Sequence, residues 1–340
     1  MISTLVVGLG QMGQSHAQAY HQNPEFQIVG LVNRSAKQLS GALSHYPIET
    51  DFYTALERLR PDLVSIATYS DSHADIAIAA MRAGAHVFVE KPIADNAIDA
   101  RRVADVARET GRKLVVGHIL RHHPTWNAFI AQARSLGGPY VFRMNLNQRS
   151  DGAAWEVHKQ LMQKTSPIVD CGVHYLDVMC QITDAAPVEV RGMGLRLSDE
   201  VAADMYNYGQ FQVLFADGSC GWYEAGWGPM MSETAHFVKD VISPAGAVSL
   251  RAPTQVSSSD LEGHTAADEL VVAPTHEPES VRTFPDSPGH QDLCNRQAAF
   301  VARAIKENID LTDHIQDVIR SLEICLAADK SIRTGLTIKL

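Results

Sequence analysis

The pattern of hydrophobic and polar positions changes about one third of the way along the chain. Up to about residue 120, short apolar runs typical of buried strands alternate with segments of helical periodicity. Such an alternation predicts a parallel sheet covered by helices on both faces. The expected strands are 2–7, 26–32, 63–67, 86–89 and 113–117, and the expected helices lie after residue 13 and at 35–44, 74–83 and 96–110.

Beyond residue 120, strand-like runs follow one another without helices between them. Consecutive strands of this kind predict a mostly antiparallel open sheet in an α+β domain. The expected strands are 140–148, 188–197, 206–215, 220–225 and 237–242, with a hairpin turn at 216–218, and the expected helices are 126–136, 166–177, 291–306 and 313–333. Residues 149–165 and 252–288 show no clear period and are expected to be irregular. At 340 residues, two domains are expected, 1–120 and 121–340.

The first apolar run leads directly into a glycine motif and then into a helical segment. Strand, G-x-G-x-x-G and helix in this order are typical of a dinucleotide-binding Rossmann domain. Gly8 permits the tight turn, Gly10 lets the backbone approach a pyrophosphate, and Gly13 lets helix and strand pack closely. The helix N-terminus, with Gln11 and Met12, offers N–H groups to the phosphates. A glycine-rich loop that binds no ligand is the alternative.

Asn33 and Arg34 follow the second predicted strand, 20 residues after Gly13. A carboxylate at this place normally binds the ribose 2′-hydroxyl of NAD. Here a neutral amide and a planar cation stand instead, which favours NADP over NAD. Arg34 as a solvated residue, or stacked on the adenine of either cofactor, remains an alternative.

Several further residues fall at the carboxyl ends of the parallel strands, where ligands bind in such sheets. They are Thr68, His73, Glu90, Lys91 and His118. Lys91 lies between a strand end and a proline, so it is placed to donate to a substrate hydroxyl or alkoxide. A cis Lys91–Pro92 bond would fix its direction. The alternative is a lysine at a strand end that points to water.

The segment 166–177 carries a second set of candidate residues. Ser166 as N-cap and Pro167 in the first turn predict a helix start. Asp170 and His174 are then one turn apart on one face, so the aspartate can orient the imidazole for acid–base work near neutral pH. An ordinary surface pair of carboxylate and imidazole is the alternative.

Three motifs together resemble the Gfo/Idh/MocA oxidoreductase family: the glycines at 8–13, Glu90-Lys91-Pro92, and Asp170-x-Gly172-x-His174-x-x-Asp177. Residues 64–93 and 118–124 are also similar, and the resemblance fades after about residue 225. It implies that Lys91 polarises the reacting oxygen, while His174 exchanges the proton with help from Asp170. It further implies hydride transfer between nicotinamide and a sugar or polyol carbon, and a second domain whose sheet binds substrate and joins subunits into a homodimer or homotetramer.

The chain departs from the family pattern at three places. Asn33-Arg34 replaces the acidic position, Tyr69 stands where proline is usual, and residues 166–168 replace a glycine-rich segment. Aromatic and cationic side chains suit sugars and acidic substituents, and each can equally be structural. The expected substrate contacts of this kind are Arg121, Trp155, His158, Lys159 and Lys164.

Composition narrows the class of protein. The formal net charge of −10 argues against nucleic acid or an anionic membrane as a partner. No apolar run has bilayer length, and a strand that begins at residue 2 leaves no room for a signal peptide. Five scattered cysteines without C-x-x-C predict buried thiols in a reducing compartment, with neither disulfides nor a metal site. A cytoplasmic location is expected.

These observations predict an NAD(P)-dependent oxidoreductase of a secondary alcohol or ketone in a sugar, polyol or sugar derivative. Two alternatives share the fold. One is a glycosidase that uses tightly held NAD in a redox-neutral cycle. The other is a non-catalytic sensor of sugars and nucleotides, although a sensor does not need Lys91, Asp170 and His174 together.

Overall fold

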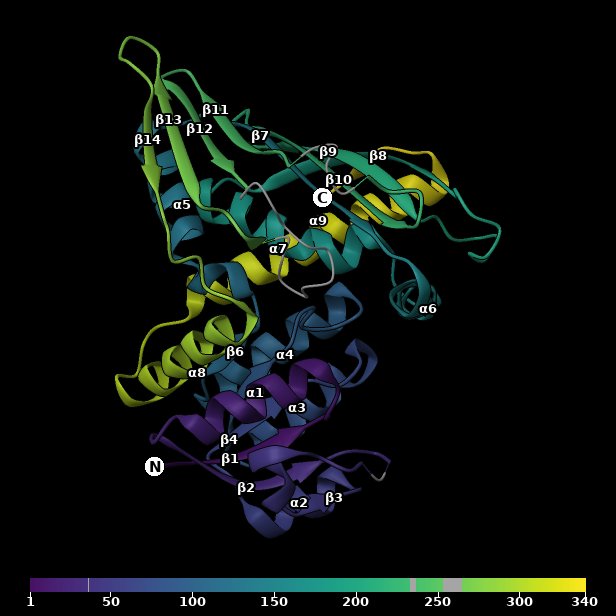
Figure 1. Ribbon diagram of the computed structural model, residues 1–340, viewed down its shortest axis with the longest axis vertical. Helices are drawn as coiled ribbons and strands as arrows, with labels where there is room; N and C mark the ends of the chain where they lie inside the picture. The colour runs from purple at the N-terminus through teal and green to yellow at the C-terminus, as the bar shows by residue number, and fades with distance from the viewer. Residues whose placement is uncertain (36, 233–236, 253–264) are drawn as a thin grey trace. The chain divides into compact units, whose positions relative to one another are not determined.

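The computed structural model describes residues 1–35, 37–232, 237–252 and 265–340, and these form two compact units (Figure 1). The first unit comprises Met1–Ile119 and Gln291–Ile319, and the second comprises Leu120–His290 and Arg320–Leu340. Residues 291–319 thus belong to the first unit, whereas the sequence pattern places them in 121–340. The reason is packing, because Leu293, Cys294 and Val301 are buried in the hydrophobic core of the first unit.

The first unit is built on a six-stranded sheet in the order β3-β2-β1-β4-β5-β6, with every adjacent pair parallel. This confirms the predicted Rossmann-type sheet and brings the carboxyl ends of its strands to one edge. The strands are β1 (Ile2–Val7), β2 (Phe26–Val32), β3 (Ile48–Glu49), β4 (Leu63–Ile66), β5 (His86–Val89) and β6 (Leu114–Val116). The α-helices are α1 (Gln11–Gln22), α2 (Phe52–Leu59), α3 (His73–Arg82), α4 (Ala97–Thr110), α8 (His290–Lys306) and the start of α9 (Thr312–Thr334).

Local signals explain where α4 begins and ends. Asn96 caps α4 by accepting a hydrogen bond from the Asp99 N–H at 2.9 Å, and Gly111 ends the helix with φ +65°.

The predicted helix at 35–44 is wrong, apart from residue 36, which lies outside the described residues. Only the short 3₁₀ turn Gly41–His45 forms there, and it starts at a glycine with φ +60°. β3 and α2 lie outside the predicted elements, although the apolar positions 52, 55, 56 and 59 behind the Asp51 cap have the spacing of an amphipathic helix.

The second unit is built on a nine-stranded sheet in the order β14-β13-β12-β11-β7-β10-β9-β8-β15. Only the central pair β7 and β10 is parallel, so the predicted mostly antiparallel α+β architecture is confirmed. The strands are β7 (Val141–Arg149), β8 (Pro187–Leu195), β9 (Tyr208–Phe215), β10 (Cys220–Gly228), β11 (Lys239–Ser243), β12 (Gly246–Arg251), β13 (Glu269–Pro274), β14 (Ser280–Thr283) and β15 (Ile338–Lys339). The helices are α5 (Pro124–Leu136), α6 (Gly152–Leu161), α7 (Pro167–Ile182) and the end of α9.

Two segments predicted as irregular in this unit contain regular structure. Residues 149–165 include α6, whose only buried residue is Trp155, so an apolar stripe is missing from the sequence. Residues 252–288 include β13 and β14, while 253–264 lie outside the described residues. All four residues of β14 are exposed, and the strand is held by pairing with β13 rather than by an apolar face.

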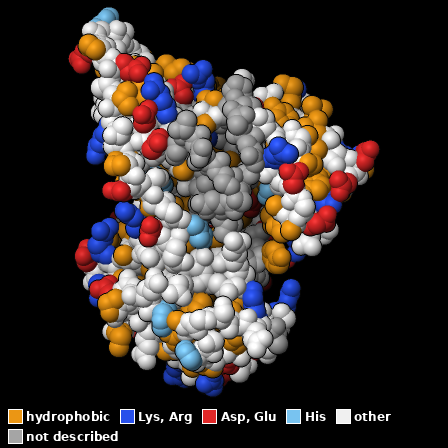
Figure 2. All heavy atoms as spheres, viewed as in Figure 1, with side chains coloured by type: hydrophobic (Ala, Val, Ile, Leu, Met, Phe, Trp, Pro, Cys, Tyr) orange, Lys and Arg blue, Asp and Glu red, His pale blue; other side chains and the backbone are white. Residues whose placement is uncertain are grey.

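The surface carries mixed charge, and the cysteines are thiols. Basic and acidic side chains lie interspersed on the face shown in Figure 2. Among the described residues, no helix is long and apolar enough to cross a membrane. All five cysteines are free thiols, and four are buried as expected, but Cys220 on β10 is exposed.

Candidate functional site

The glycine loop between β1 and α1 requires glycine at two of the three motif positions. Gly8 has φ +90°, and a Cβ there would lie 2.5 Å from the carbonyl oxygen of Ala67. A Cβ at Gly13 would lie 1.8 Å from the carbonyl oxygen of Gly8. A Cβ at Gly10 would meet no atom within 4 Å. The fold itself therefore excludes side chains at Gly8 and Gly13, whereas the space beside Gly10 suits the close approach of a phosphate.

The first turn of α1 is suited to an anion. Its N-cap is Gly10, which has no side chain to accept a hydrogen bond from the backbone N–H group of Met12 or Gly13. The first turn, all of which the structure describes, contains no acidic residue that would repel a phosphate. The residues present thus fit the pyrophosphate of a dinucleotide cofactor.

Asn33 lies at the end of β2 beside this loop. Its Oδ1 accepts a hydrogen bond from the Leu9 N–H at 3.1 Å, and its Nδ2 donates to the Ser35 carbonyl oxygen at 2.7 Å. The amide of Asn33 therefore shapes the glycine loop, in addition to any contact with a ribose. Lys37 donates from Nζ to the Leu9 carbonyl oxygen and adds a cation that the sequence pattern does not single out. In the sequence, only its position three residues after Arg34 indicates that Lys37 lies near the cofactor loop.

Glu90 and His16 form a buried pair at the carboxyl edge of the sheet. His16 Nε2 on α1 lies 2.6 Å from Glu90 Oε1, and the Lys91 N–H donates to Glu90 Oε2 at 3.2 Å. Burial alone would raise the pKa of Glu90, but the hydrogen bond from His16 and the charges of His16, Lys91 and His73 outweigh it and hold the pKa below its ordinary value. An ionised Glu90 therefore fixes the backbone of Lys91. The Lys91–Pro92 bond is cis.

His73 and Thr68 lie at the same edge. The buried His73 ring has Nδ1 at 2.8 Å from the Pro92 carbonyl oxygen and Nε2 at 3.0 Å from the Thr68 carbonyl oxygen. Thr68 Oγ1 also contacts Ser72 Oγ at 2.7 Å. The first unit thus brings together Thr68, His73, Glu90 and Lys91, as the strand ends predict. His118 follows β6 and is buried.

Asp170 and His174 lie one turn apart on α7 in the second unit. The helix starts as predicted, with Ser166 Oγ accepting from the Val169 N–H at 3.4 Å and Pro167 in its first turn. His174 is only 6% exposed. This burial differs from the solvent-exposed helical pair that was the alternative. Asp170, which is half-buried, occupies the preceding turn.

Arg121 and Asp177 anchor the same helix. Arg121 donates through Nε and Nη2 to the two carboxylate oxygens of Asp177 at 2.8 and 2.7 Å. The Asp177 side chain is fully buried, and the Arg121 side chain is 16% exposed. Such a bidentate pair is geometrically specific. Arg121 thus has a structural partner, and its contact with substrate stays a prediction.

His158 on α6 is close enough to Asp170 for the aspartate charge to act on its imidazole. Its ring stacks on Trp227 with centroids 4.4 Å apart and planes 10° apart, and its Nδ1 is 2.9 Å from Ser150 Oγ. Burial lowers the pKa of His158 to about 4, although the charge of Asp170 acts in the opposite direction. Trp227 in turn donates to Gln148 Oε1 at 2.8 Å. No motif in the sequence indicates Trp227 or Gln148.

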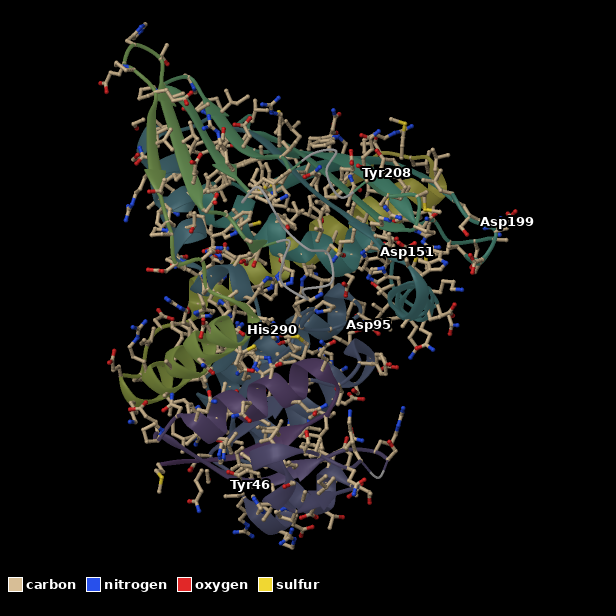
Figure 3. All side chains as sticks on the ribbon, viewed as in Figure 1. Tyr46, Asp95, Asp151, Asp199, Tyr208 and His290 are labelled. Atoms are coloured by element: carbon tan, nitrogen blue, oxygen red, sulfur yellow. The ribbon has the colours of Figure 1, made fainter. Side chains whose placement is uncertain are left out.

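Two of the other predicted substrate contacts, Trp155 and Lys159, have partners within the second unit. Trp155 is buried and donates from Nε1 to Glu200 Oε1 at 3.2 Å. Lys159 forms ion pairs with Glu200 at 2.6 Å and Glu156 at 2.8 Å. Glu200 adjoins Asp199, one of the residues labelled in Figure 3. Substrate contacts by Trp155, Lys159 and Lys164 stay predictions.

The burial of His158 predicts a pH dependence of stability. The pKa of His158 is about 4 in the folded protein against an ordinary value of 6.5, so between these pH values only the unfolded chain binds the proton. The stabilisation is complete above pH 6.5 and is lost as the pH falls toward 4, by at most about 1.4 kcal/mol per pH unit. Urea unfolding at several pH values should show a weaker pH dependence in His158→Phe, which keeps an aromatic ring on Trp227.

The exposed His276 offers a matched control, because His276→Phe removes one imidazole from the same unit. Its pH dependence should equal that of the unmodified protein. An unchanged slope in His158→Phe would show that His158 is not held neutral by burial.

Comparison with known proteins identifies the class to which this fold and these motifs belong. Residues 2–118 match the model described as "Oxidoreductase family, NAD-binding Rossmann fold" of GFO_IDH_MocA, and residues 130–236 match the GFO/IDH/MocA C-terminal domain. The chain belongs to the Gfo/Idh/MocA family.

The sequence identity to individual relatives is low. The chain is 32% identical over 165 residues to 4-carboxy-2-hydroxymuconate-6-semialdehyde dehydrogenase of Sphingobium sp., covering 45% of this chain and 52% of that protein. It is 28% identical over 194 residues to UDP-N-acetylglucosamine 3-dehydrogenase of Acidithiobacillus ferrooxidans, covering 56% and 58%. The matched regions thus span little more than half the length of these relatives. An oxidoreductase domain protein from Kribbella flavida has the same fold, with TM-score 0.80, 23% identity and coverage of 100% and 98%.

Proposed function

We propose that the protein is an NAD(P)-dependent oxidoreductase that acts on a secondary alcohol or ketone of a sugar, polyol or sugar derivative. The observation that supports this most is the carboxyl edge of the parallel sheet. There the glycine loop suited to a pyrophosphate and Lys91, with its backbone fixed by Glu90, follow strands of one sheet. The family membership supports an oxidoreductase, and the name of one relative, UDP-N-acetylglucosamine 3-dehydrogenase, supports a sugar substrate.

The proposed roles follow from the chemistry of each side chain. Lys91 donates to the substrate oxygen and stabilises the negative charge that develops on it. His174 takes the hydroxyl proton during oxidation and returns it during reduction, and Asp170 orients the imidazole. When bound, the nicotinamide supplies the carbon that accepts or gives up the hydride.

The cofactor would be held by the backbone of Gly8, Gly10 and Gly13 and by the first turn of α1. We propose a preference for NADP, because no carboxylate stands at Asn33 and two cations, Arg34 and Lys37, lie close by in the chain. Kinetic comparison of NAD and NADP tests this directly.

We also propose that the protein forms a homo-oligomer through the sheet of the second unit. Strand register places Met193 and Leu214 on one face, together with Val141, while α7 packs on the opposite face. Met193 is 65% exposed and Leu195, on the same face of β8, is 59% exposed, and neighbouring exposed apolar side chains are typical of an interaction surface. Sedimentation velocity tests the assembly. The five free thiols fit the reducing compartment expected for a cytoplasmic protein, which we keep as part of the proposal.

The decisive experiment measures nicotinamide absorbance against a panel of sugars, inositols, sugar acids and aryl glycosides. NAD and NADP are tested separately, and released aglycone is followed in parallel. We expect cofactor reduction with one class of substrate. Aglycone release without net reduction would replace the proposal with a redox-neutral glycosidase, and ligand binding without either reaction would replace it with a sensor.

A further inference from the structure

The buried ring of His73 stands between two carbonyl oxygens. Nδ1 is 2.8 Å from the Pro92 oxygen and Nε2 is 3.0 Å from the Thr68 oxygen, and both contacts have hydrogen-bond geometry. His73 is 1% exposed, so bulk water does not replace either partner. Both ring nitrogens are therefore committed to acceptors that have no proton of their own.

The chemistry of imidazole limits how these contacts are satisfied. A neutral ring has one N–H and one lone pair, whereas the protonated ring has two N–H donors. If the ring is neutral, one of its two nitrogens has no proton, and its lone pair faces a carbonyl lone pair at 3.0 Å or less. Such a contact between two buried acceptors costs free energy. Only the imidazolium ion donates to both Thr68 and Pro92.

The charges around His73 are mixed. The ionised Glu90 interacts favourably with a cationic His73, and Asp71 and Asp75 contribute negative charge from the turn before α3 and from its first turn. The N-terminus of α3 and the nearby Lys91 oppose a positive charge on the ring. His16 is hydrogen bonded to Glu90 on its other side. Burial of the ring also disfavours its charged form, and the two charge-assisted hydrogen bonds and the Glu90 carboxylate act against this cost and against the opposing charges.

These contacts connect His73 to Lys91 through the backbone. Glu90 Oε2 accepts the Lys91 N–H at 3.2 Å, and His73 holds the carbonyl of the next residue, Pro92. The peptide unit before Lys91 and the peptide unit after Pro92 are thus held by buried side chains on either side of the Lys91–Pro92 dipeptide. The other ring nitrogen of His73 joins this turn to the Thr68 loop at the end of β4.

We propose that His73 is a positioning residue that is kept protonated: its imidazolium binds the carbonyl oxygens of Thr68 and Pro92 and so fixes the direction of Lys91. The link to catalysis rests on the proposed role of Lys91. The protonation state and the anchoring of the Lys91 backbone do not depend on that role, and each has its own measurement.

The first measurement is a long-range ¹H–¹⁵N spectrum of the full-length protein labelled with ¹⁵N-histidine, recorded at pH 7. The His73 signals are assigned by their absence in His73→Gln. We expect the imidazolium pattern, with a proton on both ring nitrogens. The pattern of a neutral ring, with one unprotonated nitrogen, would overturn the proposal.

The second measurement is amide hydrogen exchange in the peptide that contains Lys91. Loss of the His73 donors in His73→Leu should speed exchange at Lys91 by roughly tenfold, because its turn opens locally more often. Exchange in the peptide that contains β2 should be unchanged and serves as the internal control. Equal exchange at Lys91 in both proteins would show that His73 does not anchor this turn.

Kinetics then test the link to Lys91. We expect His73→Leu to lower kcat by about 10- to 100-fold, with the dissociation constant of the cofactor changed by about twofold or less. His73→Gln keeps one uncharged N–H donor group and should recover part of kcat. An unchanged kcat in His73→Leu would refute the positioning role, whereas an inactive wild-type protein would count against the proposed function alone, since the other two measurements need no turnover.

Discussion

Replacing Lys91 with methionine should lower kcat by about 10³-fold and leave the affinity for the cofactor nearly unchanged. The reason is the proposed position of the ammonium group, which donates to the reacting oxygen and stabilises charge that is present mainly in the transition state. Methionine keeps an unbranched side chain as far as Cε and removes the terminal donor. The Lys91 N–H bond to Glu90 and the His73 bond to Pro92 involve the backbone, so they remain in the variant. The cofactor affinity is measured by fluorescence titration and kcat by nicotinamide absorbance.

Lys113 offers a matched control for this substitution. It precedes β6, so it lies at the amino edge of the same sheet, and its Nζ donates to the Ile309 carbonyl oxygen at 2.6 Å. Lys113→Met removes one ammonium group from the same unit and should retain kcat within about twofold. Near-normal turnover in Lys91→Met would refute the role proposed for Lys91. A parallel loss of cofactor affinity would assign Lys91 to binding instead.

The first unit could be predicted well because its signals are local in the chain. Hydrophobic runs mark the buried strands, and parallel pairing then brings their carboxyl ends to one edge. The Gly8 conformation and the close approach of Gly13 to the Gly8 carbonyl explain the glycine spacing in physical terms. The gathering of Thr68, His73, Glu90 and Lys91 at this edge was therefore predictable, while their roles in binding and catalysis stay predictions.

The partners of these residues were not predictable, because they come from distant parts of the chain. The contact of His16 with Glu90 joins positions 74 residues apart, and no spacing rule relates them. Lys239 is a second example, since a lysine in a strand is usually exposed. Its ammonium group instead lies 4.7 Å from the centre of the Tyr175 ring, and burial lowers its pKa to about 7. Such environments depend on tertiary packing.

The α7 motif shows both situations in one helix. Its start at Ser166 and the common face of Asp170 and His174 follow from local rules. The partner of Asp177 does not, because Arg121 lies 56 residues earlier in the chain. The family motif ends at Asp177, and the structure gives this residue a physical role: its buried carboxylate ties the helix that carries His174 to the segment before α5.

Removing Arg121 should therefore destabilise the second unit strongly. In Arg121→Leu the fully buried Asp177 carboxylate loses its counter-ion and both hydrogen bonds that Arg121 donates, and we expect the free energy of unfolding to fall by about 3 kcal/mol or more. The double variant Arg121→Leu with Asp177→Leu buries no charge, so it should recover most of this loss. Urea denaturation followed by fluorescence measures both.

The exposed pair of Arg251 and Glu269 provides the comparison that makes this test specific. Their side chains are 54% and 34% exposed, and the charged atoms are 3.3 Å apart. Because water and salt screen such a pair, Arg251→Leu should cost about 1 kcal/mol or less. If Arg121→Leu costs no more than Arg251→Leu, the buried pair does not anchor α7. If the double variant is as unstable as the single one, the loss comes from packing of the arginine stem rather than from an unpaired buried carboxylate.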